Sequence, residues 1–207
     1  MNLEKLKAVY DLNSTRSGSD IGGHLPLIYK LTKAIKPRVI IQAGIRDGNS
    51  DCAFALAAIE DGATLVDIDI NDVGNGVLTD VRDLEDNWTF LKGRTDSPEI
   101  VEEVQQYKGK VDIFFTDTSH NYKDTLFELN EYSKLLSPNG IIMIHDMDPW
   151  DQYPEQTRAV DEFLADNKKY KVKVQTGNNG MAVLYRLKKD LCDVKCDSDL
   201  GIGTHTV

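Results

Sequence analysis

The sequence predicts an α/β fold: a doubly wound, mostly parallel sheet that ends in an antiparallel hairpin. Between residues 38 and 146, short apolar runs rich in β-branched residues alternate with amphipathic stretches. Strands separated by helices require right-handed crossovers, which make neighbouring strands parallel. The last two apolar runs are different, because only Gly177–Gly180 separates them. A turn of hairpin length forces that final pair to run antiparallel.

Each predicted element has a local reason. Pro37 and Gly44 end the second helix and the first strand, and Asn49 and Ser97 are the expected N-caps of two later helices. The turn Ser137–Gly140 is expected to close the longest amphipathic helix. The expected strands are 38–44, 64–70, 88–93, 111–117, 140–146, 170–176 and 180–187. The expected helices are 3–12, 25–35, 49–59, 77–85, 97–107, 122–136 and 155–169.

The length and composition favour one globular domain. The chain has 207 residues, of which 41% are hydrophobic and 28% charged, so it can bury one core but hardly two. We expect the domain to span 1–188, with 1–24 forming an N-terminal helix and a substrate-side loop. Residues 189–207 are expected to be a polar tail.

Charge and cysteine usage narrow the partners and the compartment. A net charge of -10 disfavours nucleic acid and anionic membranes as partners. The N-terminus lacks the apolar core of a signal peptide, and no apolar run is long enough to span a bilayer. Three cysteines without framework spacing fit a reducing, cytoplasmic compartment. Cys192, Cys196 and His205 offer three zinc ligands, but a tail with unpaired thiols is the favoured interpretation.

Polar residues at the ends of the first two strands suggest a ligand loop. Ligands of such sheets bind outside the carboxyl ends of the strands. Gly44 permits a sharp turn, and Gly48 permits a ligand to approach the start of the next helix. Asp69 ends the second strand and can accept both hydrogens of a ribose diol. Each feature has a structural alternative, a steric glycine turn or a solvated turn carboxylate.

The fourth and fifth strands end in a second group of polar residues. Asp117 and Asp146 follow neighbouring parallel strands, so their carboxylates can converge. Two carboxylates suit Mg²⁺ or a similar cation. His120 lies one turn beyond Asp117, where it could take a proton from a substrate hydroxyl. The alternatives are that Asp117 caps the next helix and that His120 is a surface residue. The occurrence of all three residues at adjacent strand ends favours a site.

The stretch VDIFFTDTSHNYKDTLFELNEYSKLLSPNGIIMIHDM resembles a segment of class I methyltransferases, and most closely the macrocin and sugar O-methyltransferase type. The segment KPRVIIQAGIRDGNS is similar to the cofactor loop of the same family. The terminal hairpin agrees with the seven-stranded, Rossmann-like sheet of that family. The matching residues of the first segment are Asp117, His120, Tyr122, Pro138, Gly140, His145 and Asp146.

The resemblance implies that S-adenosylmethionine (SAM) donates a methyl group to a hydroxyl of a small molecule or sugar. It assigns the methionine end of SAM to Gln42, Gly44, Gly48 and Ser50, the ribose to Asp69 and the adenine to Asp96. It assigns a divalent metal to Asp117, His145 and Asp146. His120 would be the catalytic base, with Asp117 also catalytic. Trp150 and Tyr153 are candidates for stacking against a sugar.

Two departures from the family leave alternatives open. The family usually has an acid at Gln42, which holds the amino group of the cofactor with a charge that an amide lacks. His145 stands where some members have a second acidic metal ligand, and a mixed site is less selective for Mg²⁺. A SAM-binding domain with lost or altered activity is therefore the second hypothesis. A nucleotide-dependent oxidoreductase is the third, disfavoured by the hairpin and by the lack of G-x-G-x-x-G.

Overall fold

The computed structural model describes residues 3–16, 19–72, 87–150 and 152–186. The expected helix at 77–85, the tail at 189–207 and the group Cys192, Cys196 and His205 lie outside these residues. Among the described helices, none combines the length and apolarity needed to cross a bilayer.

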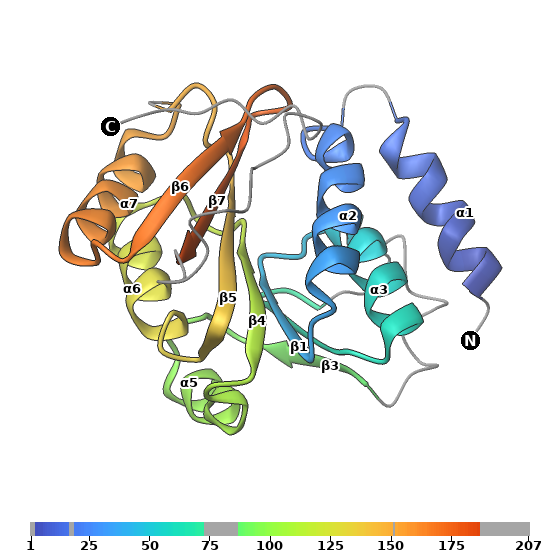
Figure 1. The fold of residues 1–207 in the computed structure, drawn as a ribbon, viewed down its shortest axis with the longest axis horizontal. Coiled ribbons are helices and arrows are strands. Elements are labelled where there is room, and N and C mark those ends of the chain that lie inside the picture. Colours follow the sequence, from blue (N-terminus) through green and yellow to red (C-terminus); the bar gives the residue numbers. More distant parts are fainter. Residues whose placement is uncertain (1–2, 17–18, 73–86, 151, 187–207) are drawn as a thin grey trace, which may run out of the picture.

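A seven-stranded sheet forms the centre of the molecule (Figure 1). Its strands are β1 (Val39–Ala43), β2 (Thr64–Asp69), β3 (Trp88–Lys92), β4 (Val111–Thr116), β5 (Leu136–His145), β6 (Tyr170–Gln175) and β7 (Met181–Arg186). Their order is β3-β2-β1-β4-β5-β7-β6. The first five strands are parallel, whereas β7 runs antiparallel to both β5 and β6. The predicted parallel sheet with an antiparallel end is confirmed.

Helices cover both faces of the sheet. Figure 1 shows α1 (Leu3–Ser14), α2 (Leu25–Ile35) and α3 (Asn49–Asp61) on one face, and α5 (Pro98–Val104), α6 (Tyr122–Tyr132) and α7 (Pro154–Asp166) on the other. Short 3₁₀ turns, η1 (Gly22–His24) and η2 (Gln105–Tyr107), precede α2 and follow α5. Successive strand residues point to opposite faces, so Ile40 joins the core under α1–α3 while Ile41 joins the core under α5–α7.

Two boundaries differ from the sequence prediction. Helix α6 ends at Tyr132 rather than 136, and β5 already begins at Leu136, opposite Val111. The turn-forming residues Pro138–Gly140 lie inside β5, where the β4–β5 register shifts. These residues form a bulge in the strand. Because Pro and Gly are common in both loops and bulges, the sequence alone did not distinguish the two. Ser97 occupies the N-cap of α5, but its hydroxyl donates to the Arg94 carbonyl and caps no amide of the helix.

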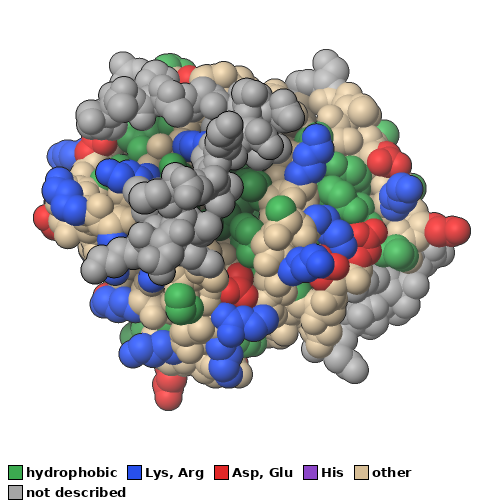
Figure 2. Space-filling view, in the orientation of Figure 1, with side chains coloured by type: hydrophobic (Ala, Val, Ile, Leu, Met, Phe, Trp, Pro, Cys, Tyr) green, Lys and Arg blue, Asp and Glu red, His purple; other side chains and the backbone are tan. Residues whose placement is uncertain are grey.

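Basic side chains do not gather into one patch on the face that Figure 2 shows. Lys and Arg side chains there are interspersed with Asp and Glu side chains. The observation concerns that face and the described residues only. It agrees with the negative net charge, which disfavours a polyanionic partner.

Candidate active site

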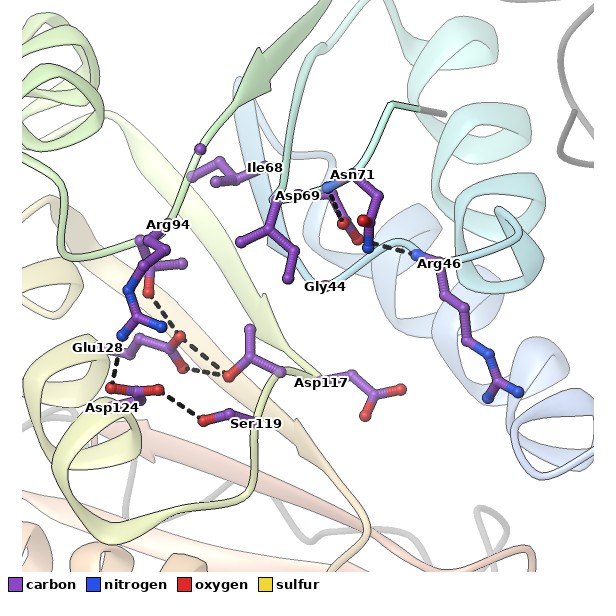
Figure 3. A pocket seen from close by; sticks show the side chains of 14 residues that line it. Gly44, Arg46, Ile68, Asp69, Asn71, Arg94, Asp117, Ser119, Asp124 and Glu128 are labelled. Carbon is purple, nitrogen blue, oxygen red and sulfur yellow. Dashed lines mark hydrogen bonds and ion pairs between the residues drawn. The ribbon is translucent and has the colours of Figure 1, made fainter. Parts of the chain in front are cut away.

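The carboxyl ends of β1, β2, β3, β4 and β5 meet at one edge of the sheet, and two adjoining cavities lie there. The first, about 290 Å³, is lined by residues that follow β1, β2, β3 and β4 (Figure 3). The second, about 210 Å³, extends toward the residue after β5 and the N-terminal segment. Gly44, Arg46, Asp117 and Thr118 line both, so the cavities meet where β1 and β4 end.

The glycine turn after β1 exists because two chains come into contact there. Gly44 has φ +81°, and a Cβ at this position would lie 1.9 Å from the carbonyl oxygen of Asp117. Only glycine fits a left-handed position this crowded. Asp69 fastens the same turn, because its Oδ2 accepts the amides of Ile45 at 2.8 Å and Arg46 at 3.0 Å. Gly44 and Asp69 thus both line the first cavity, as the glycine-turn argument predicted.

The other predicted cofactor residues lie in different places. Ser50 lines the second cavity, whereas Gly48 and Asp96 are not among the lining residues of either cavity. Asp96 is bound by the guanidinium of Arg94, at 2.8 and 3.2 Å. Gln42 is fully buried and donates from Nε2 to Asp51, while its Oε1 is buried without a hydrogen-bond partner. Their assignment to the cofactor stays a prediction.

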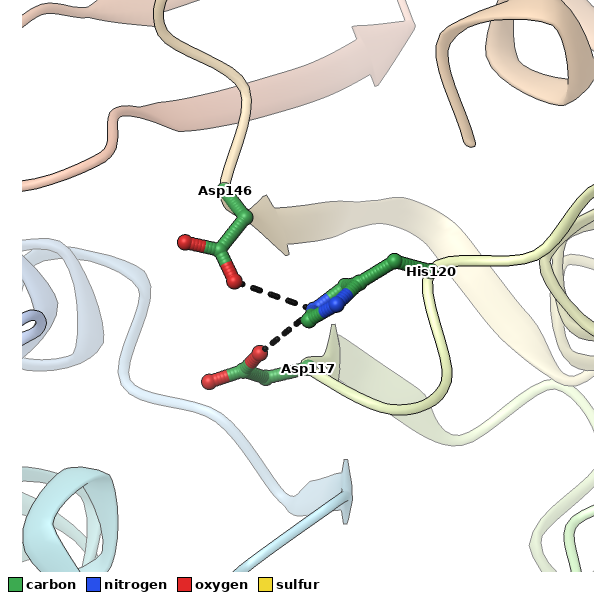
Figure 4. A group of neighbouring side chains, drawn as sticks. All are labelled: Asp117, His120 and Asp146. Atoms are coloured by element: carbon green, nitrogen blue, oxygen red, sulfur yellow. Dashed lines mark hydrogen bonds and ion pairs between the residues drawn. The ribbon is translucent and has the colours of Figure 1, made fainter. Parts of the chain in front are cut away.

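Asp117, His120 and Asp146 converge in the second cavity (Figure 4). Nε2 of His120 lies 3.2 Å from Oδ1 of Asp117 and 3.0 Å from Oδ2 of Asp146. His120 and Asp146 both have positive φ, 56° and 61°. Such backbone strain in non-glycine residues is concentrated at functional sites. Asn121, not Asp117, caps α6, so the capping alternative for Asp117 is excluded.

His145 supports this cluster from behind. It is fully buried, and its Nδ1 lies 3.3 Å from Oδ2 of Asp117 and 3.4 Å from Oδ1 of Asp146. These are ion-pair distances, although neither contact has hydrogen-bond geometry. Nε2 of His145 lies 3.2 Å from the carbonyl oxygen of Asn178, in the β6–β7 turn, and Nε2 of His24 lies 3.1 Å from the same oxygen.

The two acids and two histidines strongly shift one another's titration. Burial lowers the pKa of His120, but hydrogen bonds and charge from Asp117 and Asp146 outweigh it and raise the pKa to about 9. Burial also lowers the pKa of His145, but its close contacts with the same two carboxylates outweigh burial and raise the pKa to about 10. Burial raises the pKa of Asp146, yet the histidines hold it well below its usual range. The two carboxylates therefore favour the protonated form of both imidazoles.

The cluster has the donor set of a divalent cation site. One ligand atom each from Asp117, His120 and Asp146 lies within 4.8 Å of the others. Oδ1 of Asp146 is buried without a hydrogen-bond partner, which a cation would satisfy. Two carboxylates suit Mg²⁺ or Mn²⁺, and an imidazole nitrogen broadens the choice to other first-row metals. His145 is outside this group of three, so its predicted role as a ligand finds no support in the grouping.

Several residues that line the first cavity carried no recognisable sequence motif. Glu128 is 1% exposed and receives hydroxyl hydrogen bonds from Thr95, Thr116 and Thr118. Burial raises the pKa of Glu128, and the three hydroxyls oppose the shift. One sequence signal pointed to Glu128. Asp124, Glu128 and Tyr132 lie four residues apart, so they share one face of α6, and this face is buried together with Leu129.

Comparison with known proteins identifies the family. A family model described as a methyltransferase domain matches residues 41–147, which is more than half of the 207-residue chain. The chain belongs to this methyltransferase family. No sequence among the curated proteins matches it significantly.

Solved structures share the fold of this methyltransferase domain. The O-methyltransferase TomG of Streptomyces achromogenes, in complex with SAM, is 16% identical with a TM-score of 0.67; the match covers 89% of this chain and 90% of TomG. An O-methyltransferase of Bacillus cereus, in complex with SAH, is 13% identical with a TM-score of 0.65, covering 89% and 90%. MycE of the mycinamycin pathway, in complex with Mg, SAH and mycinamycin VI, is 14% identical with a TM-score of 0.63, covering 95% and 57%. At these identities the likeness establishes the fold.

Proposed function

We propose that this methyltransferase transfers the methyl group of SAM to a hydroxyl of a small molecule or sugar. The observation that carries the proposal is the position of Asp117, His120 and Asp146 beside the seam between the two cavities. The first cavity has Asp69 at the end of β2, where a ribose diol binds in folds of this kind. The second has an imidazole and two carboxylates, which can take up the proton that the methylated hydroxyl must lose.

His120 is the proposed base. The acceptor oxygen forms a bond to the methyl carbon as the bond from that carbon to sulfur breaks, and the hydroxyl proton moves to Nε2 of His120. The products are the methyl ether, S-adenosylhomocysteine (SAH) and protonated His120. Holding the two reactants in line supplies much of the rate. Asp117 and Asp146 then stabilise the imidazolium that forms, as their 3.2 and 3.0 Å contacts indicate.

A divalent cation would be held by Asp117 and Asp146. When bound, it would lower the pKa of the acceptor hydroxyl. It would also withdraw carboxylate charge from His120 and so lower the imidazole pKa from about 9 toward neutrality. The fold relative MycE is described in complex with Mg, which supports this proposal. His145 would hold the two carboxylates in place from the buried side.

The acceptor is proposed to enter over Tyr153. Its ring stacks on the His120 ring, with centroids 4.3 Å apart and an interplanar angle of 26°. Tyr153 also lines the second cavity, so an acceptor bound there would contact it. TomG and MycE are described in tomaymycin synthesis and with mycinamycin VI, which favours a small-molecule acceptor. A polyanionic acceptor is disfavoured by the net charge of -10.

The first experiment is calorimetric titration of the purified protein with SAH, with EDTA, Mg²⁺ or Mn²⁺ present. Micromolar binding supports the cofactor assignment, and a metal-dependent heat that Asp146→Asn abolishes supports the cation site. A panel of hydroxylated acceptors is then screened for SAH release. Binding without release by any acceptor would favour a SAM-binding domain without transfer. Absence of SAH binding, or retention of NAD(P) through purification, would overturn the proposal.

A further inference from the structure

The floor of the first cavity contains a buried carboxylate that the proposed chemistry does not use. Glu128 lies on α6, lines this cavity and is only 1% exposed. An isolated buried carboxylate is costly, so its partners determine what it does. Its neighbours are hydroxyls, whose protons can point in more than one direction.

Three threonine hydroxyls surround Glu128. Thr95 donates to Oε1 at 2.8 Å, Thr116 donates to Oε2 at 2.6 Å, and Thr118 contacts both oxygens at 3.0 and 3.2 Å. In all of these contacts the threonine hydroxyl donates and a Glu128 oxygen accepts. The lone pairs of Thr95 and Thr118, which line the cavity, are therefore left to face a ligand as acceptors.

The frame around these hydroxyls is fixed by the same helix. Tyr132 donates its hydroxyl to the Thr95 carbonyl at 3.0 Å. Asp124 accepts from Arg94 at 2.9 Å and from Ser119 at 2.7 Å. One face of α6 thus holds both loops that border the cavity, after β3 and after β4 (Figure 3). In that view Asp69 and Glu128 lie on opposite sides of the cavity, so a nucleoside whose ribose contacts Asp69 would direct its base toward Thr95 and Thr118.

We propose that Glu128 is a positioning residue that sets the base specificity of the cofactor cavity. It fixes Thr95 and Thr118 as acceptors, which selects the exocyclic amino group of adenine and disfavours a base with an oxo group at that position. The inference rests on the proposed function, because it concerns SAM as the nucleoside ligand. It is an alternative to the expected contact from Asp96, which does not line the cavity and is bound by Arg94.

The test compares binding of SAH with binding of S-inosylhomocysteine, which carries an oxo group in place of the adenine amino group and a hydrogen on N1. For the wild type we expect SAH to bind at least about tenfold more tightly, because the oxo group would face lone pairs. In Glu128→Gln the amide nitrogen donates to the threonine oxygens beside it, so those hydroxyls can direct their protons toward the cavity, while the amide oxygen still accepts from the hydroxyls on its side. We expect the preference for SAH to fall below about threefold, mainly through tighter binding of the inosine analogue.

Glu131→Gln on the same helix is the matched control, because Glu131 pairs with Lys134 at the surface. It should keep the wild-type preference. Thr95→Val is a second variant that keeps Glu128, and it should also reduce the preference by removing an acceptor. A wild type that binds both ligands equally, or a Glu128→Gln variant that keeps the full preference, overturns the inference and leaves the proposed function intact. Failure of the wild type to bind SAH overturns both.

Discussion

The two adjoining cavities are built from different chemistry, although they share the ends of β1 and β4. In the first, a buried carboxylate is surrounded by hydroxyls, and Asp69 is bound to backbone amides. In the second, two carboxylates face two imidazoles across 3.0–3.4 Å. In the first region, hydroxyls and backbone amides hold the carboxylates of Glu128 and Asp69 in place. In the second, the net charge can change when a proton or a cation binds.

The difference also appears in which polar atoms are left without partners. Both oxygens of Glu128 are hydrogen-bonded. In the second region, Oδ1 of Asp146 and Nδ1 of His145 are buried without hydrogen-bond partners. Buried polar atoms are normally satisfied, so exceptions identify positions that are completed by a ligand or used in chemistry. The comparison therefore supports the proposal that the cofactor is recognised in the first cavity and that the reaction takes place in the second.

The largest expected effect is on His120. Replacing it with Gln keeps a polar side chain but removes the proton acceptor, and general bases contribute about 10²–10⁴-fold to rate. We expect methyl transfer to the best acceptor of the panel to fall by that factor, while SAH affinity changes by less than about threefold. Partial recovery of a His120→Ala variant by added imidazole would show that the proton-accepting group is what was lost. Unchanged turnover in His120→Gln would remove the base from the proposal.

The charge of the second cavity predicts an unusual pH dependence of stability in EDTA. The folded pKa values of His120 and His145, about 9 and 10, lie above the unfolded value of about 6.5. Their stabilisation is complete below pH 6.5 and is lost as the pH rises toward 9 and 10. Together the two shifts correspond to a fall of up to about 6 kcal/mol in the free energy of unfolding between pH 6.5 and 9.5.

Urea unfolding at several pH values measures this slope. Asp146→Asn is the control, because it removes a charge that both histidines contact, and its slope should be much shallower. Mg²⁺ should also flatten the wild-type slope if it displaces the histidine protons. Equal slopes in the wild type and Asp146→Asn would contradict the ion-pair account of the second cavity.

The two regions also differ in how far the sequence alone predicts them. Asp117, His120 and Asp146 were predictable because the two acids directly follow strands and His120 lies three residues beyond Asp117. The ends of neighbouring parallel strands converge regardless of side-chain detail. Glu128, Thr95 and Thr118 were not, because their partnership joins a helix to two loops. Period-based reasoning assigns an element but not the depth at which a polar side chain is buried.

The fold shows the same limit on a smaller scale. The order of strands and helices follows from apolar periodicity, and the final hairpin follows from the length of its turn. The end of α6 and the start of β5 do not, because Pro138–Gly140 can form either a loop or a bulge. Only pairing with β4 decides between them, and pairing is a tertiary interaction.

Gln42, the penultimate residue of β1, tests whether this fully buried position needs a neutral group. Gln42→Glu restores the acid usual in the family, but the new carboxyl would meet Asp51, and both positions are fully buried. Like charges in contact raise one pKa, so the variant should lose about 1–3 kcal/mol of stability at pH 8 and less at pH 5. Thermal and urea unfolding at both pH values measure the effect. Gln42→Glu should cost less stability when it is made in an Asp51→Asn background than when it is made in the wild type. An equal cost in both backgrounds would mean that the two side chains do not interact.

The smallest expected effect is at Tyr153, where the second cavity meets its acceptor. The stack of Tyr153 on His120 is worth about 0.5–1.5 kcal/mol, as for other ring pairs. Tyr153→Ala should therefore lower turnover by about two- to tenfold, because His120 is less firmly oriented, and should leave SAH affinity unchanged. Tyr153→Phe keeps the ring and should match the wild type. Steady-state rates and SAH calorimetry separate the outcomes. Loss of SAH affinity in Tyr153→Ala would show that the two cavities act as one binding site. A loss of turnover alone would support separate sites for cofactor recognition and reaction.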